Sequence, residues 1–283
     1  MPQDPDAFQP APPISAEECA ALCDLLYRLT GIQLRSTKES LLRSRLRKRL
    51  AARGLDTWAE YHDYLQEHES EVPHFLDAMT TNETFFMREG DHWEFLRQHI
   101  IPAAAEQRRG PEREFSVWSA AASSGEELYS AALVLQESLP LSESWRLRLV
   151  GSDISGEVLE RARAGIYGER ALRALPDKLR ERYFSPEATD RYKQRWRIAP
   201  LLRQSCRFVR HNLLEPFPED DFDLVLCRNV FIYFDRRAKR RALDNLIPAT
   251  RLGGYLVFSQ TEAMILDSPL LERVRPSIYR RVG

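Results

Sequence analysis

From Phe115 onward, short apolar segments alternate with helix-patterned ones, and this alternation restricts the possible folds more than any other feature. The apolar segments predict strands at Phe115–Ala120, Leu147–Val150, Arg207–Arg210, Phe222–Cys227 and Gly254–Phe258. The helix patterns run over Glu126–Leu139, Gly156–Ala164 and Arg237–Ala249. Strands and helices in alternation predict a parallel sheet covered on both faces. Glu272–Val274 and Ile278–Val282 predict an antiparallel pair at its edge.

The first eighty residues have a different pattern. Residues 1–13 are rich in proline and poor in apolar groups, which predicts a disordered tail. Ser15 followed by Glu18 is typical of a capping box at a helix start, and Gly31 of a helix end. Residues 14–80 therefore form a predicted all-helical domain. Residues 81–112 are expected to hold a linker and a helix, and residues 113–283 the α/β domain.

One predicted helix, Ser36–Arg53, is strongly basic. Leu42, Leu46 and Leu50 recur every fourth residue and are expected to face a core. The cations cover the rest of the helix surface, namely Arg43, Arg45, Arg47, Lys48, Arg49 and Arg53. Two interpretations stay open, a solvated face and a contact surface for an acidic partner.

The composition excludes some classes of protein. The chain has 283 residues and a net charge of −1, so no field of the whole molecule steers it to nucleic acid or anionic lipid. Its start lacks the pattern of a signal peptide, and its apolar runs are too short for a membrane span. Cys19 and Cys23 lie one helical turn apart without further ligands nearby, so we expect no metal site. A reducing, cytoplasmic setting is expected.

The turn after the first predicted strand gives the main evidence on ligands. It reads Ser119-Ala-Ala-Ala-Ser-Ser-Gly-Glu-Glu127 and lacks the G-x-G-x-x-G pattern. Ligands of an open parallel sheet bind beyond the carboxyl ends of its strands. Glu126 and Glu127 open the next helix and would repel a pyrophosphate there. S-adenosylmethionine, which is cationic and has no phosphate, suits such a turn. The alternative is that both acids only stabilise the helix dipole.

Polar residues also follow three further predicted strands. Asp153 ends the second, where a carboxylate commonly holds ribose hydroxyls, although a helix cap is an alternative. Asn212-Leu213 ends the third and Arg228-Asn229 the fourth. The carboxyl ends of four successive strands thus carry polar groups, which favours a ligand site there.

Three segments of the chain resemble the chemotaxis receptor methyltransferases, the CheR family. They are Trp118-SAAASSGEELY-Ser130, Phe222-DLVLCRNVFIY-Phe234 and Thr81-NETFFMR-Glu89. Their order and spacing match the family, and the similarity runs from about Leu22 to Glu262. The resemblance implies a Rossmann-like class I S-adenosylmethionine-dependent methyltransferase domain, a small N-terminal all-helical domain, and a small inserted β-subdomain at about 188–209.

The resemblance also implies a site. Cofactor-binding positions would be Asn82, Thr84, Arg88, Ala120, Glu127, Asp153, Asn212, Leu213, Arg228 and Asn229. Arg88 and Tyr233 would lie closest to the transferred methyl group and act as catalytic residues. The activity would be methyl transfer to glutamate carboxylates of a chemoreceptor, giving methyl esters and S-adenosylhomocysteine. The alternative for Arg88 is an ion pair with Glu89 or another acid, and the alternative for Tyr233 is a half-buried core position.

The expected partner is a chemoreceptor with a helical, glutamate-rich methylation segment. Arg43, Arg47, Lys48 and Arg53 are the candidate receptor-binding residues. We expect a monomer that meets the membrane only through the receptor and binds no nucleic acid. Two other functions stay open at this point: a methyltransferase acting on RNA or a small molecule, and a non-catalytic signalling module that binds the cofactor.

Overall fold

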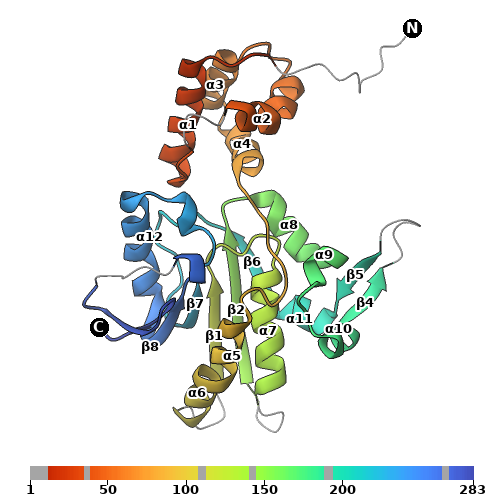
Figure 1. The fold of residues 1–283 in the computed structure, drawn as a ribbon, viewed down its shortest axis with the longest axis vertical. Coiled ribbons are helices and arrows are strands. Elements are labelled where there is room, and N and C mark those ends of the chain that lie inside the picture. The colour runs from red at the N-terminus through yellow and green to blue at the C-terminus, as the bar shows by residue number, and fades with distance from the viewer. Residues whose placement is uncertain (1–11, 35–38, 108–112, 140–144, 188–193, 263–267) are drawn as a thin grey trace. The chain divides into compact units, whose positions relative to one another are not determined.

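The computed structural model describes residues 12–34, 39–107, 113–139, 145–187, 194–262 and 268–283. The chain forms two compact units, Met1–Thr81 and Asn82–Gly283, each with its own elements (Figure 1). Most of the expected tail, residues 1–11, lies outside the described residues. From Asn82 onward, the region expected to hold a linker and a helix belongs to the second unit, and it contains helical turns from Gly90 to Gln107. The Arg109-Gly110-Pro111 stretch lies outside the described residues.

The first unit is all-helical, as predicted. Its elements are α1 (Ala16–Thr30), α2 (Glu39–Arg53), α3 (Trp58–Glu67), the 3-10 turn η1 (Glu69–Glu71) and α4 (Val72–Met79). The capping box of Ser15 and Glu18 is present, and Gly31 ends α1 in the left-handed conformation at φ 73°. Cys19 and Cys23 are both buried on α1 and are not joined in a disulfide.

A buried carboxylate fixes α2 to η1 in this unit. Glu71 is fully buried and accepts hydrogen bonds from Arg49 Nε and Nη2 at 2.8 and 2.7 Å. Arg53 Nε donates to it at 2.7 Å and the Tyr61 hydroxyl at 3.0 Å. Leu42, Leu46 and Leu50 are buried as predicted. A buried carboxylate needs such partners, because burying an unpaired charge is costly.

These contacts change the interpretation of the basic helix. Arg49 and Arg53 bond to Glu71, and Arg45 bonds to the carbonyls of Met79 and Thr80. Arg43 and Arg47 have partners as well. Arg53 is exposed, and its charge also neutralises the buried Glu71 carboxylate. Lys48 is exposed, and Arg43 and Arg47 are half-buried.

The second unit contains a seven-stranded sheet with helices packed on it (Figure 1). Its strand order is β6-β2-β1-β7-β8-β10-β9. The bounds are β1 Arg113–Ser119, β2 Trp145–Asp153, β6 Cys206–Arg210, β7 Phe222–Leu226, β8 Thr250–Val257, β9 Leu271–Arg275 and β10 Ile278–Arg281. The pairs from β6 to β8 are parallel, and β10 is antiparallel to both neighbours. The predicted parallel sheet and antiparallel edge are confirmed.

The order of the strands determines where a ligand can bind. From β1 the chain proceeds through β2 to β6 on one side, and from β7 to β8 on the other. Helix α7 (Glu126–Ser138) packs on β1, β2 and β6, whereas α12 (Arg236–Ala249) packs on β7 and β8. Because crossovers are right-handed, this reversal places the two helices on opposite faces. The crevice at the carboxyl ends of β1 and β7 is then the expected ligand position.

Further helices complete the second unit. They are α5 (Gly90–Phe95), the π-helical turn η2 (Leu96–Ile100) and α6 (Ile101–Gln107), which follow one another, and α8 (Gly156–Ala164). The 3-10 turns η3 (Phe231–Tyr233) and η4 (Gln260–Glu262) follow β7 and β8. Trp118 of β1 is fully buried in the sheet, and its Nε1 donates to Ser152 Oγ at 2.9 Å.

The inserted β-subdomain begins earlier in the chain than the expected range of about 188–209, which contains its strand β5. Its three antiparallel strands, in the order β3-β5-β4, are Ile166–Gly168, Arg195–Ile198 and Phe184–Glu187. Between and after them lie α9 (Glu169–Leu172), α10 (Asp177–Tyr183) and α11 (Pro200–Ser205). Strands of three or four residues carry little periodicity, so the sequence pattern did not indicate β3 and β4.

Candidate active site

The turn between β1 and α7 is held by the neighbouring strands. The Ala120 amide donates to the Leu226 carbonyl and the Ala122 amide to the Ser152 carbonyl, both at 2.8 Å. Gly125 has φ 94°, and a Cβ on it would lie 2.9 Å from the Ala162 methyl group. Only glycine fits that position without strain. The turn is thus fixed at the switch point of the sheet.

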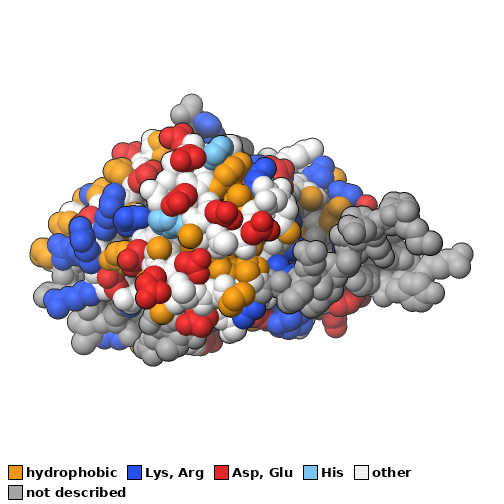
Figure 2. All heavy atoms as spheres, turned by 90° about the horizontal axis from the view of Figure 1, so that it is seen from above, with side chains coloured by type: hydrophobic (Ala, Val, Ile, Leu, Met, Phe, Trp, Pro, Cys, Tyr) orange, Lys and Arg blue, Asp and Glu red, His pale blue; other side chains and the backbone are white. Residues whose placement is uncertain are grey.

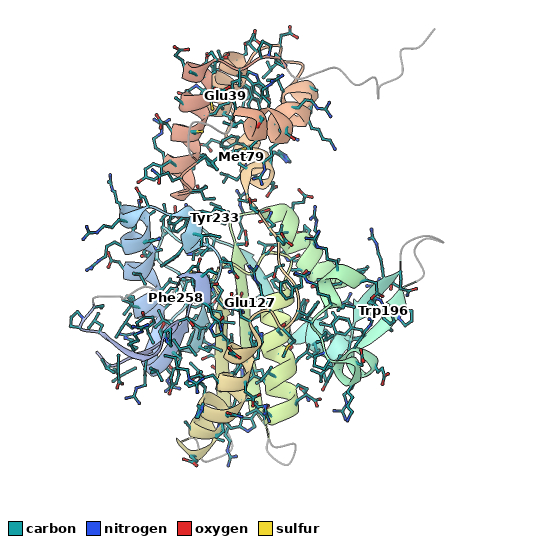
Figure 3. All side chains as sticks on the ribbon, viewed as in Figure 1. Glu39, Met79, Glu127, Trp196, Tyr233 and Phe258 are labelled. Atoms are coloured by element: carbon teal, nitrogen blue, oxygen red, sulfur yellow. The ribbon has the colours of Figure 1, made fainter. Side chains whose placement is uncertain are left out.

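Glu127 lies at the centre of the site (Figure 3). Its carboxylate accepts a hydrogen bond from Ser119 Oγ at 2.7 Å and one from Arg228 Nη1 at 3.2 Å. Its side chain is 11 % exposed. Burial raises the pKa of Glu127, and the negative charges of Glu89 and Glu262 add to this, while Arg228 opposes it. The protonation of Glu127 is therefore sensitive to any charge that is brought next to it.

Asp153 closes the adjacent part of the crevice at the end of β2. Its two carboxylate oxygens accept from the backbone amides of Ser123 at 2.9 Å and Ser155 at 3.0 Å. The side chain thus joins the β1–α7 turn to the end of β2. It does not cap α8, because the N-cap of that helix is Ser155, whose Oγ accepts from the Val158 amide. The Asn82 carbonyl accepts from Ser123 Oγ at 3.2 Å, which brings Asn82 to the same place.

Arg228 is a buried connector rather than an exposed ligand group. Its side chain is 1 % exposed and its Nη2 donates to the Arg88 carbonyl at 2.6 Å. Trp93 Nε1 donates to the same carbonyl at 2.9 Å, and the guanidinium lies over the Trp93 ring at 5.3 Å. Arg228 therefore joins α7, through Glu127, to the backbone that carries Arg88.

The alternative ion pair between Arg88 and Glu89 is not formed. Arg88 Nη1 donates to the Glu83 carbonyl at 3.0 Å, and its guanidinium lies 5.6 Å from the Phe85 ring centre. Glu89 instead lies 3.5 Å from Arg228 Nη2. The Arg88 side chain is half-buried and its charge has no carboxylate partner among the described residues. It can accept a substrate carboxylate without breaking an ion pair.

Two acids that the sequence analysis did not select complete the site. Glu89 accepts from Ser259 Oγ at 2.6 Å and from the Gln260 amide at 3.1 Å. Glu262, which is buried, accepts from the amides of Asn229 and Ile232 at 2.9 and 3.2 Å. Neither acid stands at the end of a strand. Glu89 directly follows Arg88, and Glu262 lies in η4, which follows β8.

The remaining predicted site residues lie at the same edge or follow its strands. Asn229 has φ 62° and donates from Nδ2 to Ser259 Oγ at 2.8 Å. Asn212 Oδ1 accepts from the Leu214 amide at 3.1 Å in the turn after β6, and Leu213 is buried there. Thr84 and Tyr233 are half-buried. Candidate receptor residues Arg43, Arg47, Lys48 and Arg53 belong to the first unit.

The charges of the site fit a cationic ligand. The carboxylates of Glu89 and Glu127 lie within 3.5 Å of the buried Arg228 guanidinium, and the charge of a third acid, Glu262, acts on Glu127. An excess of negative charge favours a sulfonium and an ammonium group and disfavours a pyrophosphate. Arg228 Nε is buried and has no hydrogen-bond partner among the described residues. The donor and acceptor set therefore suits S-adenosylmethionine and does not suit a dinucleotide.

This fold and this acidic crevice define a Rossmann-like S-adenosylmethionine-dependent methyltransferase. Residues 82–278 match the CheR methyltransferase SAM-binding domain, and residues 17–80 match the CheR methyltransferase all-alpha domain. The chain belongs to the CheR family.

Relatives match over almost their whole length. A chemotaxis protein methyltransferase of Borreliella burgdorferi is 31 % identical over 95 % of each chain. Chemotaxis protein methyltransferase 2 of Pseudomonas aeruginosa is 36 % identical over 93 % of this chain and 92 % of its own. The chemotaxis protein methyltransferase of Salmonella typhimurium is 37 % identical over 85 % and 82 %. Within the described part of the chain, the helices are too short or too polar to cross a bilayer.

Proposed function

We propose that the crevice beyond β1, β2, β6 and β7 is where this chain transfers a methyl group to a chemoreceptor glutamate. As a CheR family member it is an S-adenosylmethionine-dependent protein-glutamate methyltransferase of chemotaxis. The observation that carries the location is the acid-lined turn at Glu127, which lies at the point where the strand order reverses.

The cofactor, when bound, supplies a methyl group on a positively charged sulfur. Glu127 would face its cationic part, and Asp153 its ribose hydroxyls. Ala120 leaves room for close approach, and Asn212, Leu213, Asn229, Asn82 and Thr84 would line the remainder. Arg228 holds Glu127 and the Arg88 backbone in fixed positions, so its contribution is to the geometry of the pocket.

Arg88 has the main task toward the substrate. A glutamate carboxylate, with an ordinary pKa near 4.3, is ionised at neutral pH and needs no strong base. The reaction therefore depends on positioning, which can contribute roughly 7–11 kcal/mol. Arg88 would hold the carboxylate by charge-assisted hydrogen bonds, and Tyr233 would orient it. The side chains around the site would exclude water from it.

The experiment is labelled methyl transfer to chemoreceptor-containing membranes, followed by mild base. Glutamyl methyl esters release labelled methanol, whereas labelled amines and nucleic acids do not. Base-labile label on the receptor supports this function. Base-stable label, or label on RNA, contradicts it.

We also propose which segment of the receptor this chain contacts. We infer a helical, glutamate-rich methylation segment, contacted by Arg43, Arg47 and Lys48 of α2, with Arg53 acting through its support of Glu71. The same proposal takes the chain to be a cytoplasmic monomer that reaches the membrane through its receptor and binds no nucleic acid. Charge complementarity between a basic helix and an acidic one supports it.

A further inference from the structure

Helix α12 begins with an unusual set of charges. Arg236, Arg237 and Lys239 lie in its first turn, and the helix has no acid there besides the cap residue Asp235. Arg236 and Arg237 are exposed and Lys239 is half-buried. Within the described part of the chain, none of the three forms an ion pair or a side-chain hydrogen bond. We name these three residues the α12 basic patch.

Helix stability does not account for the patch. The N-terminus of a helix carries a partial positive charge, so cations in the first turn are unfavourable there. Eight other helices of the described residues have an acid in the first turn, namely α1, α2, α3, α5, α7, α8, α9 and α10. Cations that oppose the dipole and lack internal partners are best explained by a partner outside the chain.

The patch adjoins the candidate active site. Tyr233 precedes Arg236 by three residues, so their Cα atoms lie within about 11 Å by chain length alone. Ile232 follows the buried Phe231 and precedes the half-buried Tyr233, and it is 54 % exposed. Its amide donates a hydrogen bond to the Glu262 carboxylate. The apolar side chain is therefore presented to solvent by a fixed backbone, next to the cations. Figure 2 shows Lys and Arg side chains gathered toward the left of that view.

We propose that Ile232 and the α12 basic patch form a docking surface for the acidic segment that carries the methyl-accepting glutamate. This rests on the function proposed above. The substrate carboxylate enters beside Tyr233, so neighbouring carboxylates of the same segment reach the patch, and an apolar side chain of the segment covers Ile232. Complementary charge of this kind fixes register and raises the rate of encounter.

The surface also distinguishes substrate from product. Esterification removes one negative charge from the segment, so a fully methylated segment binds the patch less tightly than an unmethylated one. Release of the product is thereby favoured, and segments with free carboxylates are preferred. An anionic lipid surface would also attract the cations, but Ile232 and the position beside the catalytic residues favour the protein segment.

The test compares two double variants with the same change of charge. Arg236→Glu with Arg237→Glu reverses the patch and places acids where the helix dipole favours them, so folding is preserved. Lys178→Glu with Arg273→Glu changes two exposed cations elsewhere in the second unit that have no ion pair within the described residues. Binding of a soluble chemoreceptor fragment and the KM for its methylation are measured at low and high salt, with product binding to the cofactor site as a further check.

The patch variant should weaken fragment binding and raise KM about tenfold at low salt, and the difference should shrink at high salt. The control variant and S-adenosylhomocysteine affinity should stay at wild-type values. Equal KM and binding in the patch variant and the wild type would overturn the docking surface. A loss that appears only with anionic vesicles, and not with the soluble fragment, would assign the patch to lipid. Absence of base-labile ester with wild-type enzyme refutes the proposed function instead, and the binding comparison still decides on the surface.

Discussion

At the residue scale, the site depends on how each charge is neutralised. Arg228 is buried against Glu127 and the Arg88 carbonyl, whereas Arg88 itself has no carboxylate partner in the described structure. A fully paired charge supports structure, and an unpaired one near a crevice is available to a ligand. The two arginines thus have different roles, although both lie in motifs that the resemblance selected together.

Replacing Arg88 should separate activity from stability. In Arg88→Ala, we expect turnover to fall roughly 100-fold or more, because the carboxylate loses its positioning group. The free energy of unfolding should change by less than about 1 kcal/mol, since only one bond to a carbonyl is lost. Denaturation and single-turnover methylation measure both. Arg88→Lys, which keeps the charge but not the bidentate geometry, should recover part of the rate. A variant with wild-type rate would show that the active centre lies elsewhere.

Asp153 is expected to affect both the cofactor and the fold. In Asp153→Asn, one of the two backbone amides of Ser123 and Ser155 would face an NH2 group instead of an oxygen. We expect at least a tenfold loss of S-adenosylhomocysteine affinity, about 1.4 kcal/mol, together with lower stability. Calorimetry on this variant and on Asp244→Asn, an exposed control, separates the effects. Unchanged affinity in Asp153→Asn would remove Asp153 from the pocket.

At the element scale, the sequence predicted the regular pieces and missed the irregular ones. The sheet strands and α7, α8 and α12 have clear periodicity, and their ends carry Glu127, Asp153, Asn212 and Arg228. Glu89 and Glu262 could not be selected in this way, because they act through left-handed or 3-10 backbone. Only tertiary contacts, such as Glu89 with Ser259, give these acids a role. Helix periodicity likewise gave no indication of the partners of Arg45, Arg49 and Arg53.

A buried histidine makes the second unit sensitive to acid. His92 Nε2 bonds Ser277 Oγ at 2.8 Å and so joins α5 to the turn between β9 and β10. Burial lowers its pKa to about 4, and the neighbouring Arg228 adds to this against the acids Glu89 and Asp91. The folded state therefore binds the proton less well than the unfolded chain. The contribution of neutral His92 to the free energy of unfolding is therefore complete above pH 6.5, and it is lost as the pH falls toward 4.

We expect this group to contribute on the order of 3 kcal/mol to that loss. Denaturant titrations between pH 7 and 4 measure it. His92→Gln keeps a hydrogen bond to Ser277 but cannot be protonated, so its stability should vary less with pH in this interval. An identical pH profile in both proteins would contradict the assignment.

In the first unit, loss of the buried Glu71 carboxylate is expected to lower the free energy of unfolding. In Glu71→Ala, the charges of Arg49 and Arg53 lose their common partner, so we expect destabilisation of about 3–5 kcal/mol. Glu69→Ala, an exposed acid of the same turn, is the matched control and should change stability by less than about 0.5 kcal/mol. Thermal unfolding of each variant provides the measurement. If the two substitutions cost the same, the buried cluster does not hold α2 in place.

At the scale of the whole molecule, each unit has a separate task. The second unit contains every predicted cofactor residue, and the first contains the basic helix α2. Sequence patterns predicted this division, but they did not indicate that residues from Asn82 onward belong to the second unit or that the β-subdomain begins at Ile166. The reason is physical: residues after Asn82 are tied to the sheet by contacts such as that with Ser123, which no local pattern encodes.

One measurement tests the central claim most directly. Purified protein is incubated with labelled S-adenosylmethionine and membranes that contain a chemoreceptor, and the labelled receptor is then treated with mild base. The account predicts that wild-type protein labels the receptor, that base releases the label as methanol, and that Arg88→Ala abolishes almost all of it while still binding S-adenosylhomocysteine. Label that resists base, or equal labelling by wild type and Arg88→Ala, would contradict it.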